Sequence, residues 1–329
     1  MFNIKMKNYI FDIDILKKIA GLHRNLMTLI KESLNTFETN KDIYMYIDNY
    51  ICQNNLSKAF PIGISINHII AHDSYHDSNI KKLITGDFIK IDVGLIELGN
   101  IIDCARTFVY KSVIPQCILD CEEISNKVEL YIREQIKLEG KVQIQKISAL
   151  TYANIVCKGY LALDYLGGHT IEFNKVHGKH YILSKPLKLL PKEASAFIDS
   201  SAEISDEEMF AIEIYIGEQK ASGEMVKSST IPITHYQVND TEQLSNIKLN
   251  QDETTTLNKL IEISNNLVYE YTNHKQFNPK IIKKLIESNA IIKHEALEFV
   301  CVNKKDKIKY IQYEDCFLVR NGELINLSK

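Results

Sequence analysis

The sequence predicts an α+β fold made of two similar halves with a site between them. The order helix, helix, strands occurs in residues 13 to 110 and occurs again from about residue 116 to 217. Apolar residues follow a helical period in the first part of each half and a strand pattern in the second. A repeated order of this kind indicates two half-domains that face each other across a crevice. With 329 residues, the chain is long enough for one or two domains.

In the first half, two helices precede the strands. Residues 13 to 35 place Ile19, Leu26 and Ile30 on one helical face. A second helix is predicted from about residue 41 to 52, after the cap candidates Thr39 and Asn40. The extended segment 59 to 72 follows, broken by a proline and a glycine. The segment leads through a polar loop to a hairpin.

The hairpin, residues 88 to 110, carries an aspartate in the middle of each arm. With a two-residue turn at its tip, Asp92 lies opposite Ala105 and Asp103 lies opposite Gly94, so both carboxylates share one face. Two ionised carboxylates on an apolar surface cost several kcal/mol each unless a positive group lies between them. The hairpin therefore predicts a bound cation, although a buried lysine would also meet this requirement.

The second half contains helices near residues 117 to 136 and 144 to 160, and then a strand-rich region to residue 217. Residues 229 to 298 differ in pattern, because polar loops surround helical segments there. We predict that they form a helical insertion subdomain. A final strand near the C-terminus completes the core sheet. We therefore expect a catalytic domain of residues 1–228 and 299–329, interrupted by a subdomain of residues 229–298.

Composition excludes several classes of protein. The net charge of −3 leaves no basic stripe for nucleic acid, so we expect no direct DNA binding. Seven cysteines without a CxxC motif suit a reducing compartment and not a disulfide framework or a structural zinc site. No segment reaches the roughly 20 apolar residues that span a bilayer. These features predict a soluble cytoplasmic protein without a membrane partner.

Five ionisable residues stand inside apolar strand patterns: Asp92, Asp103, His169, Glu213 and Glu314. Four carboxylates balance the charge of two divalent cations, and an oxygen-rich set with one nitrogen favours Mn, Fe, Co or Zn in a paired site. Two such ions can activate water for amide hydrolysis. Any one of these acids alone is more often a salt-bridged structural residue, but the five together predict a dinuclear metallohydrolase.

Several dispersed motifs resemble those of methionine aminopeptidases, whose pita-bread fold is shared with aminopeptidase P, prolidase and creatinase. They are the two aspartates eleven residues apart, Gly168-His169 followed by His177, Ala211-Ile-Glu213, and Gln312-Tyr-Glu314. Segment 59 to 72 and the long insertion are similar to those of the type 2 enzymes. The resemblance extends from about Leu16 to Val319. It implies a pita-bread fold with pseudo-twofold halves and a helical insertion.

The resemblance also implies a role for each site residue. Asp92 would bind one metal ion, His169 and Glu213 the other, while Asp103 and Glu314 would bridge both. The implied catalytic residues are His72 and His177, which would position the substrate, and Glu314, which would also shuttle a proton. We expect Phe60, Ile70 and Val176 to line the substrate pocket. The remaining histidines, including His23, His235 and His294, are expected on the surface or in loops.

The implied reaction removes the initiator methionine from nascent polypeptides, with the ribosome as a further partner. The alternative is a catalytically silent pita-bread protein that acts as a ribosome-associated binding module. A proline-specific peptidase is a third interpretation, weakened because those enzymes usually carry an additional N-terminal domain. The chain departs from the family pattern in residues 73 to 76, in residues 171 to 174 and at Arg106, a position that is more often apolar.

Overall fold

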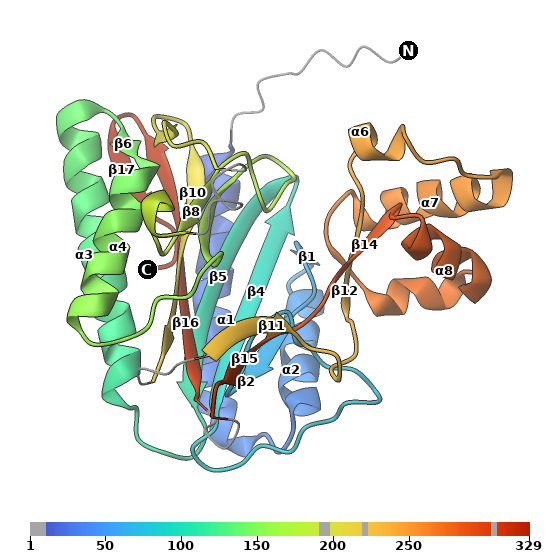
Figure 1. Cartoon of the computed structure of the whole chain (residues 1–329), viewed down its shortest axis with the longest axis horizontal. Coiled ribbons are helices and arrows are strands. Elements are labelled where there is room, and N and C mark those ends of the chain that lie inside the picture. The colour runs from blue at the N-terminus through green and yellow to red at the C-terminus, as the bar shows by residue number, and fades with distance from the viewer. Residues whose placement is uncertain (1–10, 191–197, 219–222, 304–307) are drawn as a thin grey trace.

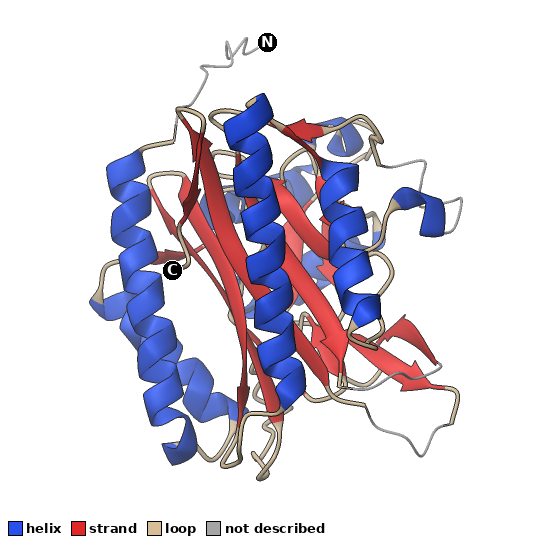
Figure 2. Ribbon diagram, turned by 90° about the vertical axis from the view of Figure 1, so that its left-hand side faces the viewer, coloured by secondary structure: helices blue, strands red, loops and turns tan. Residues whose placement is uncertain are grey.

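In a computed structural model, two helix-covered sheets stand side by side and a smaller lobe projects from them (Figure 1). The structure describes residues 11–190, 198–218, 223–303 and 308–329. The order of elements repeats as predicted, with two helices and then strands in each half. Figure 2 shows long helices lying across one face of the strands. No helix among the described residues is long and apolar enough to cross a membrane.

In the first half, two helices pack on a four-stranded sheet. Strand β4 pairs with β5 along one edge and with β1 and β2 along the other. The elements are α1 (Ile13–Ser33), η1 (Leu34–Thr36), α2 (Asn40–Gln53), β1 (Ser57–Lys58), β2 (Gly63–Ile66), β4 (Phe88–Glu97) and β5 (Asn100–Val109). Thr39 caps α2, as predicted, through a capping box with Asp42.

The hairpin has the register that the sequence predicted. Asp92 lies opposite Ala105 and Asp103 lies opposite Gly94. The turn is Leu98-Gly99, and both residues have positive φ angles, 48° and 81°, as a two-residue hairpin turn of this twist requires. The turn therefore fixes the parity that directs both aspartates to one face.

The second half has its own helices and a five-stranded sheet of order β17-β16-β10-β7-β8. Helix α3 packs on β10, β16 and β17. The elements are α3 (Gln116–Glu139), β6 (Val142–Gln143), α4 (Ile144–Cys157), β7 (Gly167–Ile171), β8 (Tyr181–Leu183), η2 (Leu187–Leu189), β9 (Glu203–Ile204), β10 (Met209–Gly217), β16 (Tyr310–Arg320) and β17 (Glu323–Asn326). Strand β16 places Glu314 in mid-strand.

The projecting lobe contains a small sheet as well as helices, which the interpretation as a purely helical insertion did not foresee. It has its own hydrophobic core, which includes Val238, Leu260, Leu285 and Ile291. A further sheet of order β11-β15-β3 lies outside this lobe and packs on the main body, beside Tyr215 and Tyr310. The elements are β3 (Ile69–Ala71), β11 (Gly223–Lys227), β12 (His235–Val238), α6 (Thr241–Leu244), α7 (Gln251–Ser264), β13 (Tyr269–Glu270), η3 (Tyr271–Gln276), α8 (Pro279–Glu287), β14 (Ile291–His294) and β15 (Leu297–Cys301).

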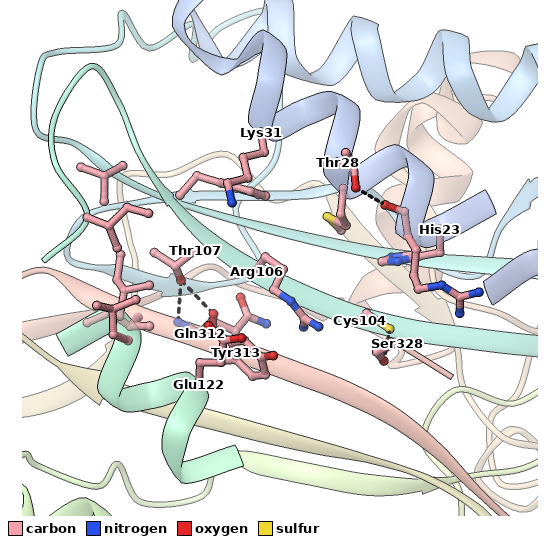
Figure 3. Close-up of a pocket in the computed structure, with 18 residues that line it drawn as sticks. His23, Thr28, Lys31, Cys104, Arg106, Thr107, Glu122, Gln312, Tyr313 and Ser328 are labelled. Atoms are coloured by element: carbon pink, nitrogen blue, oxygen red, sulfur yellow. Dashed lines mark hydrogen bonds between the residues drawn. The ribbon is translucent and has the colours of Figure 1, made fainter. Parts of the chain in front are cut away.

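Side chains join the two halves at the seam between β5 and β16 (Figure 3). Thr107 Oγ1 donates to the carbonyl of Gln312 at 2.8 Å and accepts from its N–H at 2.9 Å. Arg106 donates from Nη1 to the carbonyl of Glu314 and from Nη2 to the carboxylate of Asp315. Asp315 is fully buried. The departure from the family pattern at Arg106 is therefore one partner of a buried ion pair across the seam.

Candidate metal centre

Five strands from both halves bring the predicted metal ligands together. Asp92 and Asp103 come from β4 and β5 of the first sheet, and the other three come from the second sheet: His169 on β7, Glu213 on β10 and Glu314 on β16. Glu213 and Glu314 are direct cross-strand partners, so their side chains share a face. The centre is thus assembled across the seam.

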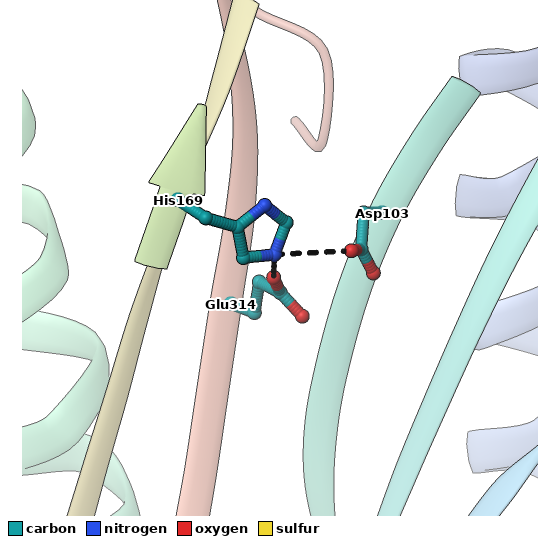
Figure 4. Close-up of side chains that lie close together, drawn as sticks. All are labelled: Asp103, His169 and Glu314. Atoms are coloured by element: carbon teal, nitrogen blue, oxygen red, sulfur yellow. Dashed lines mark ion pairs between the residues drawn. The ribbon is translucent and has the colours of Figure 1, made fainter. Parts of the chain in front are cut away.

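The ligand atoms form two groups that share Glu314. One group is Asp103, His169 and Glu314, and the other is Asp92, Glu213 and Glu314, with the ligand atoms of each group within 4.8 Å of one another. His169 Nε2 lies 3.4 Å from Asp103 Oδ2 and 3.9 Å from Glu314 Oε1 (Figure 4). A single carboxylate that belongs to two groups has the placement that a bridging ligand needs.

Orphaned oxygen atoms show that the residues fit a bound cation. Oδ1 of Asp92 and Oδ1 of Asp103 are both buried, and no hydrogen-bond partner lies within reach among the described residues. A buried carboxylate oxygen without a partner is costly. Because carboxylates with one imidazole are a donor set for Mn, Fe, Co or Zn, a pair of divalent ions would satisfy these atoms.

Crowding of the acids changes how they titrate in the metal-free protein. Burial, together with the charges of Asp103 and Glu213, raises the pKa of Asp92 well above its usual value, and burial likewise raises the pKa of Glu314. Burial also raises the pKa of Glu213 to about 7. At His169, burial opposes the charged form, but the hydrogen bond and the charge of Asp103 outweigh it and raise the pKa.

These shifts predict that the metal-free protein loses stability as the pH rises above about 6.5. A buried acid whose pKa is raised keeps its proton in the native state where the unfolded chain has already lost it, so stability falls with rising pH until the native acid ionises, at about pH 7 for Glu213. The buried histidines with lowered pKa values, such as His72, are neutral in both states above their ordinary value of 6.5 and cancel. Thermal unfolding of chelator-treated protein across this range should show a falling midpoint that Mn²⁺ restores, and a flat profile would contradict the prediction.

Gln312 and Tyr215 hold the acids in place, and sequence reasoning gave neither residue a role. Gln312 Nε2 donates to Asp92 Oδ2 at 2.9 Å and to Glu213 Oε1 at 2.8 Å. The Tyr215 hydroxyl donates to Glu213 Oε1 at 2.6 Å. Strand parity could have found both, because Gln312 lies two residues before Glu314 and Tyr215 lies two residues after Glu213. Such partners orient metal ligands.

A cavity of about 210 Å³ adjoins the ligands. Phe60 and Val176 line it, where the sequence placed them. The prediction is wrong for Ile70, which is fully buried in a separate cluster with residues such as Leu163, while its neighbour Ala71 lines the cavity instead. Consecutive residues of β3 point to opposite faces, so Ala71 faces the cavity and Ile70 points away from it.

Four histidines besides His169 line the same cavity: His72, His177, His235 and His294. The first two are the predicted catalytic residues. The prediction of a surface or loop position is wrong for His235 and His294, whose rings lie 5.8 and 6.0 Å from that of His72. It is also wrong for His23, which is buried on α1 with Nε2 3.0 Å from the carbonyl oxygen of Val93. These three histidines contact residues that are distant in sequence, so the local sequence pattern could not reveal their positions.

Burial keeps the cavity histidines neutral near pH 7. It lowers the pKa of His72 to about 4 and lowers those of His177 and His235 well below the usual value. His72 Nδ1 lies 3.3 Å from the carbonyl of Glu295, which can accept its proton and leave Nε2 as an acceptor. His72 also has a φ of 62°, a strained conformation for a residue with a side chain and one that is frequent at functional sites.

Sequence comparisons find distant relatives among methionine aminopeptidases. No model of a protein family matches the chain. A methionine aminopeptidase of Thermococcus onnurineus is 28% identical over 154 residues, which are 47% of this chain and 49% of that protein. One from Methanothermus fervidus is 29% identical over 138 residues, 40% of this chain and 73% of that protein. The chain therefore spans about half the length of the Thermococcus relative that it matches.

Solved structures show the fold over nearly the whole chain. The methionine aminopeptidase of Rickettsia prowazekii matches with a TM-score of 0.63 and 15% identity over 98% of this chain and 99% of that one. A thermophilic Arx1 matches with a TM-score of 0.73 and 12% identity over 96% and 91% of the two chains. The prolidase of Pyrococcus horikoshii has a TM-score of 0.54 and 13% identity, with 97% and 63% covered. The predicted pita-bread fold is confirmed, because structures of methionine aminopeptidases and prolidases match it over nearly the whole chain.

Proposed function

We propose that this protein is a type 2 methionine aminopeptidase that removes the initiator methionine from nascent polypeptides with the help of two divalent metal ions. The observation that carries the proposal is the convergence of five ligand side chains, with buried carboxylate oxygens that lack any other partner among the described residues. The distant similarity to methionine aminopeptidases supports the same class of reaction. The insertion between β10 and β16 supports the type 2 assignment.

The metal ions would be held by Asp92, Asp103, His169, Glu213 and Glu314. Bound there, two divalent ions would supply Lewis acidity toward the peptide carbonyl and lower the pKa of a water molecule. Glu314, which belongs to both ligand groups, would be shared by the two sites. Glu314, whose pKa burial raises in the metal-free protein, would accept the proton of the attacking water and pass it to the leaving amine.

The histidines of the cavity would position the peptide. His72 has its Nδ1 directed to the carbonyl of Glu295, so its Nε2 would accept the N–H of the scissile amide. The ring of His177 lies 4.4 Å from that of His169, beside the ligands, where it would stabilise the reacting carbonyl oxygen. Phe60, Val176 and Val268 would contact the apolar side chain of the first residue.

The ring of Phe60 fits because Gly94 has no side chain. A Cβ atom at Gly94 would lie 2.2 Å from Cε1 of Phe60, well inside van der Waals contact. The glycine opposite Asp103 in the hairpin therefore makes room for one wall of the substrate cavity.

A peptide assay on metal-loaded protein tests the proposal. Chelator-treated protein is reconstituted with Mn²⁺ or Co²⁺ and given a Met-Gly peptide, a Met-Pro peptide and an Ala-Pro peptide. Release of methionine from Met-Gly is the expected result. Cleavage restricted to the Xaa-Pro bonds would instead indicate a proline-specific peptidase. Failure on every peptide, together with no metal by elemental analysis, would refute the enzyme proposal.

One contact favours a second candidate, a catalytically silent binding module associated with the ribosome. Because Gln312 donates to both Asp92 and Glu213, part of the ligand set is held together without a cation. The two candidates differ in metal content. Stoichiometric metal in protein purified without chelator supports the enzyme, whereas its absence, together with co-sedimentation with ribosomes, supports the binding module.

Replacing His72 with alanine should separate binding from turnover. We expect His72→Ala to retain both metal ions, since His72 belongs to neither ligand group, and to lose roughly 10²- to 10³-fold in kcat, the range typical of a lost hydrogen bond to the reacting groups. Elemental analysis and the Met-Gly assay measure the two effects. His76→Ala, in the same loop but outside the cavity lining, is the control. Loss of metal from His72→Ala would show that its role is misassigned.

A further inference from the structure

A second and larger cavity, about 370 Å³, lies between α1 and α3 (Figure 3). We call it the rear cleft, because its floor is the reverse side of the two strands that carry Asp103 and Glu314. Cys104 and Arg106 alternate with Asp103 along β5 and so face the other way. The lining includes Arg24, Met27, Lys31, Arg106, Leu119 and Glu122.

The charged groups of the rear cleft are mostly cationic. Three cations line it, Arg24, Lys31 and Arg106, against the single acid Glu122. Lys31 lines the cleft from α1 and Arg106 lines it from β5 (Figure 3). The Arg106 charge is partly matched by Asp315, but its side chain retains 21% exposure and lies within the lining. An anion that entered the cleft would therefore meet a surplus of positive charge.

The walls between these charges are apolar. Met27 lines the cleft from α1, and Ile118 and Leu119 line it from α3. The apolar surface continues beyond the mouth, because Ile114 is 52% exposed and Leu119 is 47% exposed. Arg24 and Lys31 are seven residues apart on one helix, so their Cα atoms are separated by about 10 Å along α1. An aliphatic chain fits against the apolar walls between the charged groups and the mouth.

We propose that the rear cleft binds a small amphiphilic anion, with a carboxylate or phosphate head on an aliphatic chain. The head would lie beside Arg106 and one of the two α1 cations, Arg24 or Lys31, and the chain would cover Met27 and Leu119. A neutral aliphatic molecule would leave the cations unmatched, and a bare anion would leave the apolar walls in water. The cavity volume lies within the range of about 300 to 1,000 Å³ that is usual for small-molecule sites.

Calorimetric titration of chelator-treated protein with decanoate, decyl phosphate and decanol tests the proposal, all below their aggregation limits. Without metal ions, the acidic centre offers no competing site for the anionic heads, so the result does not depend on the proposed peptidase activity. We expect at least one of the two anions to bind at least tenfold more tightly than decanol. The tighter anion identifies the head group. Equal binding of decanol, or no binding of either anion, would overturn the proposal.

Matched variants locate the site. The double variant Arg24→Met/Lys31→Met should weaken binding of the anion at least tenfold. Lys17→Met, which removes one positive charge from an exposed part of α1, should leave it unchanged. Leu119→Trp, which fills the cleft from α3, should abolish binding. If Lys17→Met weakens binding as much as the double variant, attraction to the whole surface explains the affinity and the site is wrong.

Methyl NMR provides a readout that does not require a substitution. In protein labelled at the methionine methyl groups, decanoate should shift the signal of Met27, which lines the cleft. The signal of Met45, 42% exposed on α2, should not move. Shifts of Met45 without Met27 would place the ligand elsewhere and refute the assignment.

Discussion

Asp103→Asn is expected to abolish metal binding and peptide hydrolysis while the fold persists. Asp103 belongs to the ligand group of His169 and Glu314, and an amide is a much weaker ligand for a divalent ion than a carboxylate. The loss should exceed the roughly 10- to 100-fold that follows removal of an outer partner of a metal ligand. Elemental analysis and the Met-Gly assay measure both losses.

The metal-free form of the same variant should be at least as stable as the metal-free wild type. The charge of Asp103 contributes to the raised pKa values of Asp92 and Glu314, so its removal relieves repulsion in the acidic centre. Asp120→Asn is the control, because Asp120 is a buried acid paired with Lys158 on the outer side of the second half and should not affect metal content. A variant that keeps two metal ions would remove Asp103 from the ligand set.

Arg106→Met is expected to destabilise the protein by about 3 kcal/mol, because it leaves the buried carboxylate of Asp315 short of its main partner. Lys329, at 3.3 Å from Asp315, partly compensates. The variant also removes the bond from Arg106 to the carbonyl of Glu314, so metal affinity should fall as well. Urea unfolding and calorimetric titration with Mn²⁺ measure the two effects.

Two further variants test whether the expected loss of stability comes from leaving the charge of Asp315 unpaired. Arg106→Met/Asp315→Asn, which removes both charges, should recover part of the lost stability, since the cost comes from an unpaired buried charge. Lys18→Met breaks an exposed pair with Glu97 and should cost less than about 1 kcal/mol. An Arg106→Met variant as stable as Lys18→Met would show that the buried pair contributes little.

The predicted parts of the centre depend on local periodicity. An acid in the middle of an apolar strand is visible in sequence, and the strand period places the aspartates at positions 92 and 103 on one face. The same pattern, an acid in the middle of an apolar strand, identified Glu213 and Glu314 as candidate ligands in the other half. Their convergence on His169 required the pairing of distant strands, which the sequence pattern alone did not contain and which the resemblance to a family supplied.

The missed features depend on contacts between distant segments. His235 and His294 belong to strands β12 and β14 of the insertion, which pair directly opposite each other at these two residues. Their position beside His72 follows from how the insertion folds back over the first half. Arg106 looked anomalous in sequence because its partner, Asp315, is 209 positions away. Periodicity places a residue on a face, but it does not identify what covers that face.

The ligands are divided between the two sheets, so the metal centre is complete only while the two halves stay together. The first half supplies Asp92 and Asp103, and the second supplies His169, Glu213 and Glu314, so neither half alone holds a complete set. Metal ions bound here would act as a cross-link between halves that are otherwise joined at β5 and β16 by side chains. Hydrogen exchange at this seam should therefore slow on metal loading more than exchange within either helix layer. The same ions would then take part in the reaction and also slow the transient separation of the two halves.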